Sequence, residues 1–102
     1  MKALSDAQVG LVVRRARALS DPTRVRILEV LGRSEQPVGQ IATTLGSQPS
    51  TVSKHLQVLF LAGLVHRRRA ASAVIYSITD VELLSWSRYL GAPEVGASAR
   101  RA

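Results

Sequence analysis

Apolar residues recur at helical spacing through most of the 102-residue chain, and residues that start or stop helices bound each run. The first run begins at Ser5-Asp6-Ala7-Gln8, which fits a capping box, and continues to about Leu19. The second begins at Ser20-Asp21-Pro22, a cap followed by proline in the first turn, and ends near Gly32. The pattern therefore predicts two helices in the first third of the chain.

A pair of short helices joined by a tight turn is predicted between residues 38 and 65. The first has an apolar stripe, and Gly46 ends it because glycine takes the left-handed conformation without steric cost. Ser47 is placed to cap the second helix, with Pro49 in its first turn. The buried stripe of this second helix is expected to be Val52, Leu56 and Leu59. The arrangement is typical of a helix-turn-helix whose second helix, 48–59, enters a DNA major groove.

Two extended segments follow, at about 64–69 and 74–78, and the second is rich in β-branched and aromatic residues. They predict a hairpin, or wing, over 64–78. Thr79-Asp80-Val81-Glu82 fits a second capping box, which would open a last helix ending near Leu90. The expected fold is mainly α with a small β-hairpin: a winged helix-turn-helix with five helices. One domain is expected over 1–92, followed by a flexible tail over 93–102.

Charge and composition narrow the classes of partner. The chain has 14 Lys and Arg against 7 Asp and Glu, a net charge of +7 that favours a polyanion such as nucleic acid. It has no cysteine, so it supplies no disulfide, thiolate metal ligand or cysteine nucleophile. No signal-peptide pattern opens the chain, and the longest apolar run, 58–65, is too short to span a bilayer. We therefore expect a protein of the cytoplasm with no membrane partner.

Candidate DNA contacts lie on the polar face of the 48–59 helix and on the wing. Glutamine can pair with adenine, lysine with guanine, and the threonine methyl can pack on thymine, whereas hydroxyl groups also suit phosphates. The residues expected to approach bases are Gln48, Ser50, Thr51 and Lys54. The residues expected at phosphates are Ser47, Ser53 and Gln57, and the wing is expected to add Arg67, Arg68 and Arg69. The alternatives are helix capping or solvation for the hydroxyls and a solvated charge run for the arginines.

Other polar side chains favour structural roles. Arg24, just after the Pro22 cap, is expected to steady local structure more than to contact DNA. His55 is expected to be packed or hydrogen-bonded, and His66 to be an exposed strand residue. Two histidines so placed, with no carboxylate in a recognised spacing, do not make a zinc site, so neither a metal nor a cofactor is expected.

These segments resemble the ArsR/SmtB type of winged helix-turn-helix repressor. The resemblance is carried by ALSDPTRVRILEVL at 18–31 and by the segment 47–65 with its core STVSKHLQVLFLAGLV, and the order of elements extends it over about 4–90. It implies a homodimer joined through the first and last helices, bound to an inverted-repeat operator from which an inducer releases it. The interface residues that it implies are Val9, Val12, Val13, Ala16, Leu84 and Trp86.

The chain departs from the sensor patterns of that family. Metal-sensing members carry a Cys-x-Cys pair where this chain has Pro37 and Gly39. Others use histidine and carboxylates on the last helix, where this chain has Asp80 and Glu82 but no histidine. Thiol sensors need two cysteines. The effector is therefore not expected to be a thiol-liganded metal, and a small organic molecule, a partner protein, an oxygen- and nitrogen-liganded metal, or no effector all stay open.

The wing tip departs as well. Members of the family usually have glycine followed by arginine or lysine there, whereas this chain has Ala71 and Ser72. Because a type I′ turn without glycine is disfavoured, we expect a longer or looser wing tip. The arginines at 67–69 would then supply the minor-groove contact from the strand.

The most direct interpretation is a sequence-specific, homodimeric transcriptional repressor of double-stranded DNA. No Ser–His–Asp arrangement, phosphate-cradling glycine loop or paired acid is present, so an enzyme is not expected. The alternative is a protein-interaction or nucleoid-type module that keeps the winged fold without operator specificity.

Overall fold

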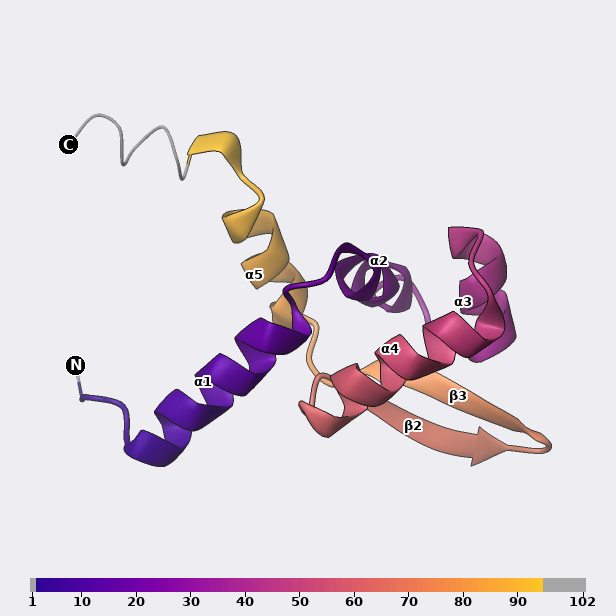
Figure 1. Cartoon of the computed structure of the whole chain (residues 1–102), viewed down its shortest axis with the longest axis horizontal. Helices are drawn as coiled ribbons and strands as arrows, with labels where there is room; N and C mark the ends of the chain where they lie inside the picture. The colour runs from indigo at the N-terminus through magenta and orange to yellow at the C-terminus, as the bar shows by residue number, and fades with distance from the viewer. Residues whose placement is uncertain (1, 95–102) are drawn as a thin grey trace.

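The computed structural model describes residues 2–94, and it contains five helices and a three-stranded sheet in that part of the chain (Figure 1). The elements in chain order are α1 (Asp6–Ala18), α2 (Pro22–Leu31), β1 (Gln36–Pro37), α3 (Val38–Leu45), α4 (Pro49–Leu61), β2 (Val65–Ala70), β3 (Ala73–Ile78) and α5 (Glu82–Leu90). The predicted fold class is confirmed. Of the predicted tail at 93–102, Pro93 and Glu94 are helical and 95–102 lie outside the described residues.

Three of the predicted helix boundaries are confirmed by their hydrogen bonds or backbone angles. The Ser5 hydroxyl accepts a hydrogen bond from the Gln8 amide at 3.1 Å, and the Gln8 side chain accepts one from the Ser5 amide at 2.8 Å. Asp21 caps α2 by accepting bonds from the next two free amides, at 2.8 and 3.2 Å. Gly46 ends α3 with a φ of 63°, in the left-handed region that glycine adopts without strain.

Two predicted caps are wrong. The N-cap of α4 is Gln48 rather than Ser47, and no side chain accepts a hydrogen bond from the free amides of the first turn. Pro49, the first residue of the helix, has no amide N–H that needs a partner. The last helix opens at Val81 without a capping box. Thr79 instead donates its hydroxyl to the carbonyls of Gly63 and Leu64, both at 3.1 Å. These acceptors are 15 and 16 residues away in sequence, so the local pattern could not reveal them.

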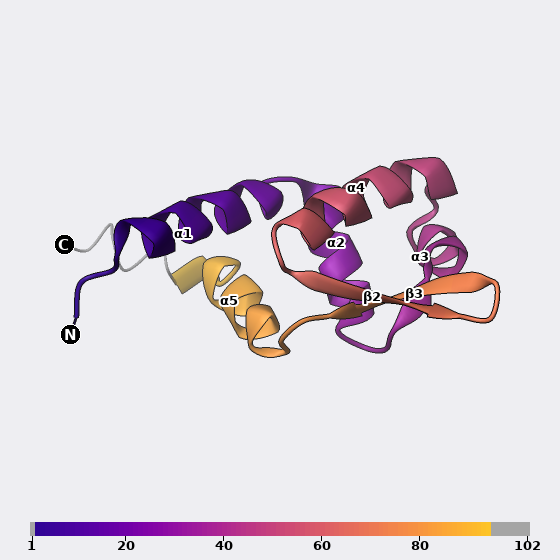
Figure 2. The same cartoon turned by 90° about the horizontal axis from the view of Figure 1, so that it is seen from below.

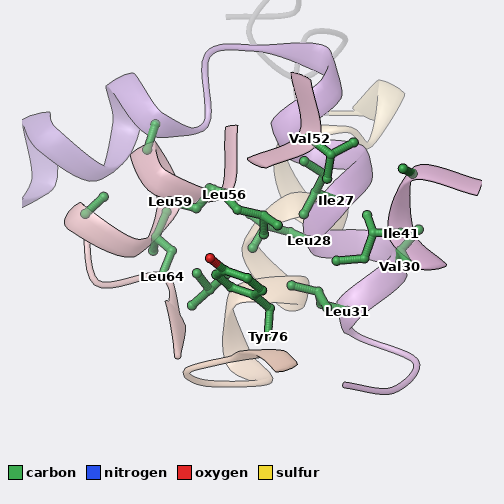
Figure 3. Close-up of a cluster of buried hydrophobic side chains, with 14 residues drawn as sticks. Ile27, Leu28, Val30, Leu31, Ile41, Val52, Leu56, Leu59, Leu64 and Tyr76 are labelled. Carbon is green, nitrogen blue, oxygen red and sulfur yellow. The ribbon is translucent and has the colours of Figure 1, made fainter. Parts of the chain in front are cut away.

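The core lies between α2, α3, α4 and one face of the sheet (Figure 3). Its largest fully buried side chains are Ile27, Leu28, Ile41, Val52, Leu56 and Leu59. Tyr76 of β3 lies below them and is only 7% exposed. Burying an aliphatic side chain of this size stabilises a fold by roughly 1.5–3 kcal/mol, so this cluster fixes how α4 is held.

The sheet has the order β1-β3-β2, with both pairs antiparallel. Strand β1 is only two residues long; Gln36 pairs with Tyr76 and Pro37 with Ile75. Two residues carry no alternation that could mark a strand, so this pairing follows from tertiary contact alone. It anchors the start of α3 to the hairpin.

The wing tip is tighter than expected. Ala70 pairs with Ala73, which leaves only Ala71 and Ser72 in the turn, so the prediction of a longer or looser tip is wrong. Ala71 adopts the left-handed conformation in this two-residue turn, with a φ of 55°. A left-handed alanine costs roughly 1–2 kcal/mol, and the extended ladder of β2 and β3 holds it there.

The two ends of the molecule differ in how they are packed (Figures 1 and 2). At one end lie α3, the start of α4 and the wing tip; α1 and α5 lie at the other. Ala18 is the one buried residue of α1, and α5 has none. Within residues 2–94, no helix combines the length and the apolar composition needed to cross a membrane.

Candidate nucleic-acid interface

The outer face of α4 carries the polar side chains that the sequence assigned to DNA. Val52, Leu56 and Leu59 point into the core and fix the rotation of the helix. The residues left exposed on the other side are Gln48, Ser50, Thr51, Ser53, Lys54 and Gln57. Ser47, in the turn before the helix, is half-buried. The structure therefore places the candidate residues of the helix on one accessible surface.

The wing is held against α4 by Arg67. Its guanidinium lies over the Phe60 ring, 3.8 Å from the ring centroid, and donates a hydrogen bond to Gln57 Oε1 at 3.3 Å. A cation–π contact at an exposed site stabilises by about 0.5–1 kcal/mol. Gln57 and Arg67 were predicted as separate DNA contacts, but the structure shows them as a bonded pair that connects helix and wing.

The three wing arginines are divided between the two faces of β2, since side chains alternate along a strand. Arg68 projects away from α4 and forms an ion pair with Glu35 in the loop after α2. The hydrogen bond from Arg68 is the main reason that the pKa of Glu35 lies below its usual value, with the Arg68 charge acting in the same direction and partial burial opposing both. Arg67 and Arg69 share the other face, and in residues 2–94 the Arg69 side chain has neither an ion pair nor a hydrogen bond. Arg69 is thus the wing guanidinium with its donors available.

Arg24 and His55 belong to a network that joins three helices, which confirms their predicted structural roles. Arg24 donates to the Ala18 carbonyl at 2.7 Å and to the Arg17 carbonyl at 3.2 Å, and its third nitrogen lies 3.3 Å from His55 Nδ1. Burial raises the pKa of Asp21, but the backbone amides of Arg24 and Thr23 and the nearby charges of His55 and Arg24 together hold it below its usual value. The network fixes the end of α1 and the start of α2 against α4.

One residue that sequence reasoning missed is Arg15. Its Nε donates to the Ala62 carbonyl at 3.2 Å, where α4 ends and its free carbonyls carry the negative end of the helix dipole. The sequence offered no signal for this bond, because its partners are 47 residues apart. Arg15 therefore connects α1 to the C-terminal end of α4.

The residues assigned to a dimer interface fall into two groups. The side chains of Val9, Val12 and Val13 on α1 are exposed, as are Ala16 and Trp86, which is 64% exposed. Leu84 instead packs within its own chain, since a Cβ added at Gly32 would lie 2.6 Å from Leu84 Cδ1. Five further large apolar side chains are exposed at this end: Leu4, Leu11, Val81, Tyr89 and Leu90.

A helix-turn-helix followed by a β-hairpin beside its second helix defines the class of winged helix-turn-helix proteins. The family model described as a helix-turn-helix domain matches residues 19–68. The HTH-type transcriptional regulator KmtR of Mycobacterium tuberculosis is 40% identical over 77 residues, which are 76% of this chain and 59% of KmtR. The chain thus spans less than two thirds of KmtR.

Solved structures give the same result. The crystal structure of M. tuberculosis Rv0081 matches with a TM-score of 0.76 and 34% identity, covering 96% of this chain and all of that one. The solution structure of fragment 1–100 of Mb0332 from Mycobacterium bovis matches with a TM-score of 0.78 and 32% identity, covering 88% and 89%. It is a homodimeric winged helix-turn-helix DNA-binding domain of a possible ArsR-family transcriptional regulator. The present chain belongs to this ArsR type of helix-turn-helix regulator and is not an enzyme.

Proposed function

We propose that this chain is a homodimeric, sequence-specific transcriptional repressor that binds an inverted-repeat operator. The main support is the exposed polar face of α4, which a buried stripe holds outward and which the wing flanks. An α-helix with such a face fits the B-DNA major groove, which is about 12 Å wide. The family membership of the chain agrees with this role.

Base recognition is proposed for the first two turns of α4, where Gln48, Ser50, Thr51 and Lys54 are exposed. Lysine donates to the acceptors of guanine, glutamine pairs with adenine, and the threonine methyl packs on thymine. Ser47 and Ser53 are proposed to bind phosphates. Arg69 of the wing is proposed to contact DNA directly, and Gln57 and Arg67 are proposed to contact it as a bonded pair. The ion pair with Glu35 keeps Arg68 from such a contact.

Dimerisation is proposed through α1 and α5. A soluble monomer rarely leaves this many large apolar side chains exposed at one end of an elongated molecule. The similar Mb0332 fragment is a homodimer, which supports dimerisation here. A two-fold axis through that end would present two copies of α4 to successive turns of one DNA face, which is how symmetric dimers read inverted repeats.

We further propose that any effector acts without thiolate ligands, since the chain contains no cysteine. Within residues 2–94, no three side chains of the His, Cys, Asp and Glu types gather in one place. The proposed site of action is the cytoplasm, where the operator DNA would be accessible.

The proposed function is tested by selecting operator fragments with the purified dimer and comparing their affinity with that of random DNA. A repressor should prefer its operator by roughly a thousandfold or more. Lys54→Ala should weaken operator binding by about 1–3 kcal/mol and random-DNA binding much less, if the lysine reads a base. Arg26→Ala, which removes one exposed charge from α2, is the control and should leave the preference unchanged.

A preference near one would overturn the proposal in favour of a nucleoid-type or protein-interaction module. An equal loss on both DNAs for Lys54→Ala would overturn its base-reading role and assign it to phosphate.

A further inference from the structure

An open groove runs between α1 and the second half of α4, on a surface that the proposed base-reading residues do not use. Its floor is apolar and includes Val13, Val58 and Leu61. Three arginines line it as well: Arg14 and Arg17 from α1 and Arg24 from α2. A cationic rim on a groove beside a DNA-recognition helix raises the question of what it binds.

Two of the three guanidinium groups have donors to offer. Arg24 is occupied by two backbone carbonyls and His55. In residues 2–94, the side chains of Arg14 and Arg17 are exposed and form neither an ion pair nor a hydrogen bond. The nearest acidic residue before Arg14 on α1 is Asp6, about 12 Å away along the helix axis. Asp21 is bound to backbone amides, and within residues 2–94 no carboxylate forms an ion pair with Arg14 or Arg17.

The groove and the wing lie on different sides of α4. Successive residues of a helix turn by about 100°, so the mean direction of the groove residues Val58, Leu61 and Ala62 lies roughly 120° from that of Gln57 and Phe60, which touch the wing. Lys54 projects into the arc between these two sides. The outward face of α4 therefore has arginines of the wing on one side and Arg14 and Arg17 on the other.

This placement matches the form of a major groove, whose floor of base edges has a sugar–phosphate backbone on each side. We propose that Arg14 and Arg17 bind the backbone phosphates on the side of α4 away from the wing. The two flanks would hold α4 in register, with phosphate contacts on both sides and base contacts between them. This inference rests on the proposed function, because it takes α4 to be the helix that enters the groove.

The test uses Arg14→Gln, Arg17→Gln and the double variant, each as the full-chain dimer. Each phosphate contact contributes about 0.9 to the slope of log affinity against log salt. A single variant should therefore lower the slope by about 1.8 for a dimer and the double variant by about 3.6. Because phosphates carry no sequence, affinity for operator and random DNA should fall together, leaving their ratio unchanged.

Arg26→Gln is the matched control, since it removes the same charge from an exposed position on α2 outside the groove. Phosphate-ethylation interference should identify backbone positions that matter to the native dimer and no longer matter to the double variant. Light scattering at the assay concentration should show that every variant remains dimeric.

A slope change no larger than that of Arg26→Gln would overturn the inference. Dissociation of the Arg14 and Arg17 variants into monomers would also overturn it, because these residues would then contact the partner subunit rather than DNA. Failure of the proposed function is a separate result, read from the native protein as equal affinity for operator and random DNA. The slope changes could still appear in that case, because they report backbone contact alone.

Discussion

The half of the molecule formed by α2, α3, α4 and the sheet differs sharply from the half formed by α1 and α5. The first contains nearly all of the buried apolar side chains, with Ile27, Leu56 and Leu59 fully enclosed. The second exposes large apolar groups such as Val12 and Trp86, which are 54% and 64% exposed. Apolar residues recur at helical spacing in both halves, but only the first half buries most of them within its own chain.

The difference shows how a small chain can divide its hydrophobic residues between two purposes. The packed half fixes the rotation of α4 and so decides which side chains point outward. The unpacked half is connected to it by a few apolar contacts, of Ala18 and Leu84, and by polar ones, among them the bond from Arg15 to Ala62 and the network around Arg24. Its apolar groups are the ones we propose to join two copies.

The largest effect should come from a cavity in the packed half. Leu56→Ala removes a side chain that is fully buried between α4 and the core. It should lower the free energy of unfolding by about 2–5 kcal/mol, because the lost burial and the cavity both cost stability. Urea denaturation measures this, and Ser53→Ala on the exposed face of the same helix should change stability by less than about 0.5 kcal/mol. Equal effects of the two variants would refute the assigned rotation of α4.

The next effect should separate the two halves. Trp86→Asp places a charge on the exposed face of α5 and should weaken dimerisation by about 2 kcal/mol or more, while the protomer keeps its helical content. Sedimentation equilibrium and circular dichroism measure the two quantities, with Thr44→Asp at the other end of the molecule as the control. Leu84→Asp should damage the fold as well, because Leu84 packs on Gly32. A Trp86→Asp protein that remains dimeric would remove α5 from the interface.

A smaller effect of opposite sign is expected at the wing tip. Ala71→Gly should raise the free energy of unfolding by about 0.5–1 kcal/mol, because glycine relieves the positive φ but loses more entropy on folding. Thermal unfolding of the variant beside Ser72→Gly measures the gain. Destabilisation by Ala71→Gly would show that the turn does not strain this residue.

The smallest effect concerns acid pH. The pKa of Asp21 is lower in the folded chain than its ordinary value of 3.8, so its charged form is favoured by folding. Its stabilising contribution is present above about pH 4 and is lost as the pH falls through the folded pKa. Asp21→Asn should therefore reduce the dependence of the melting temperature on pH between about pH 5 and pH 2. An unchanged dependence would show that the charge of Asp21 does not matter to folding.

Sequence reasoning succeeded where the determinants were local. The caps at Ser5 and Asp21 and the left-handed Gly46 each depend on residues within one turn, and all three are present. The polar face of α4 followed in the same way from the spacing of three buried residues. The spacing of the α1 valines places them on one apolar side of the helix, and only the family resemblance implied that this side faces a second copy.

It failed where the partner is distant in the chain. Strand β1 exists because of a strand about 40 residues later, and Thr79 bonds to Gly63 and Leu64, between α4 and β2, instead of capping α5. The same limit hid the pairing of Arg68 with Glu35, so a cluster of three arginines was expected to act as one. At the wing tip, the pairing of β2 with β3 forms a tight turn although glycine, the residue that such a turn prefers, is absent.

The account as a whole is tested most directly by hydroxyl-radical footprinting of the native dimer on its selected operator. It predicts two protected half-sites related by a dyad, with centres about 34 Å or a multiple of that apart on one face of the DNA. Continuous protection without symmetry, or a single protected site with one protomer bound, would contradict it.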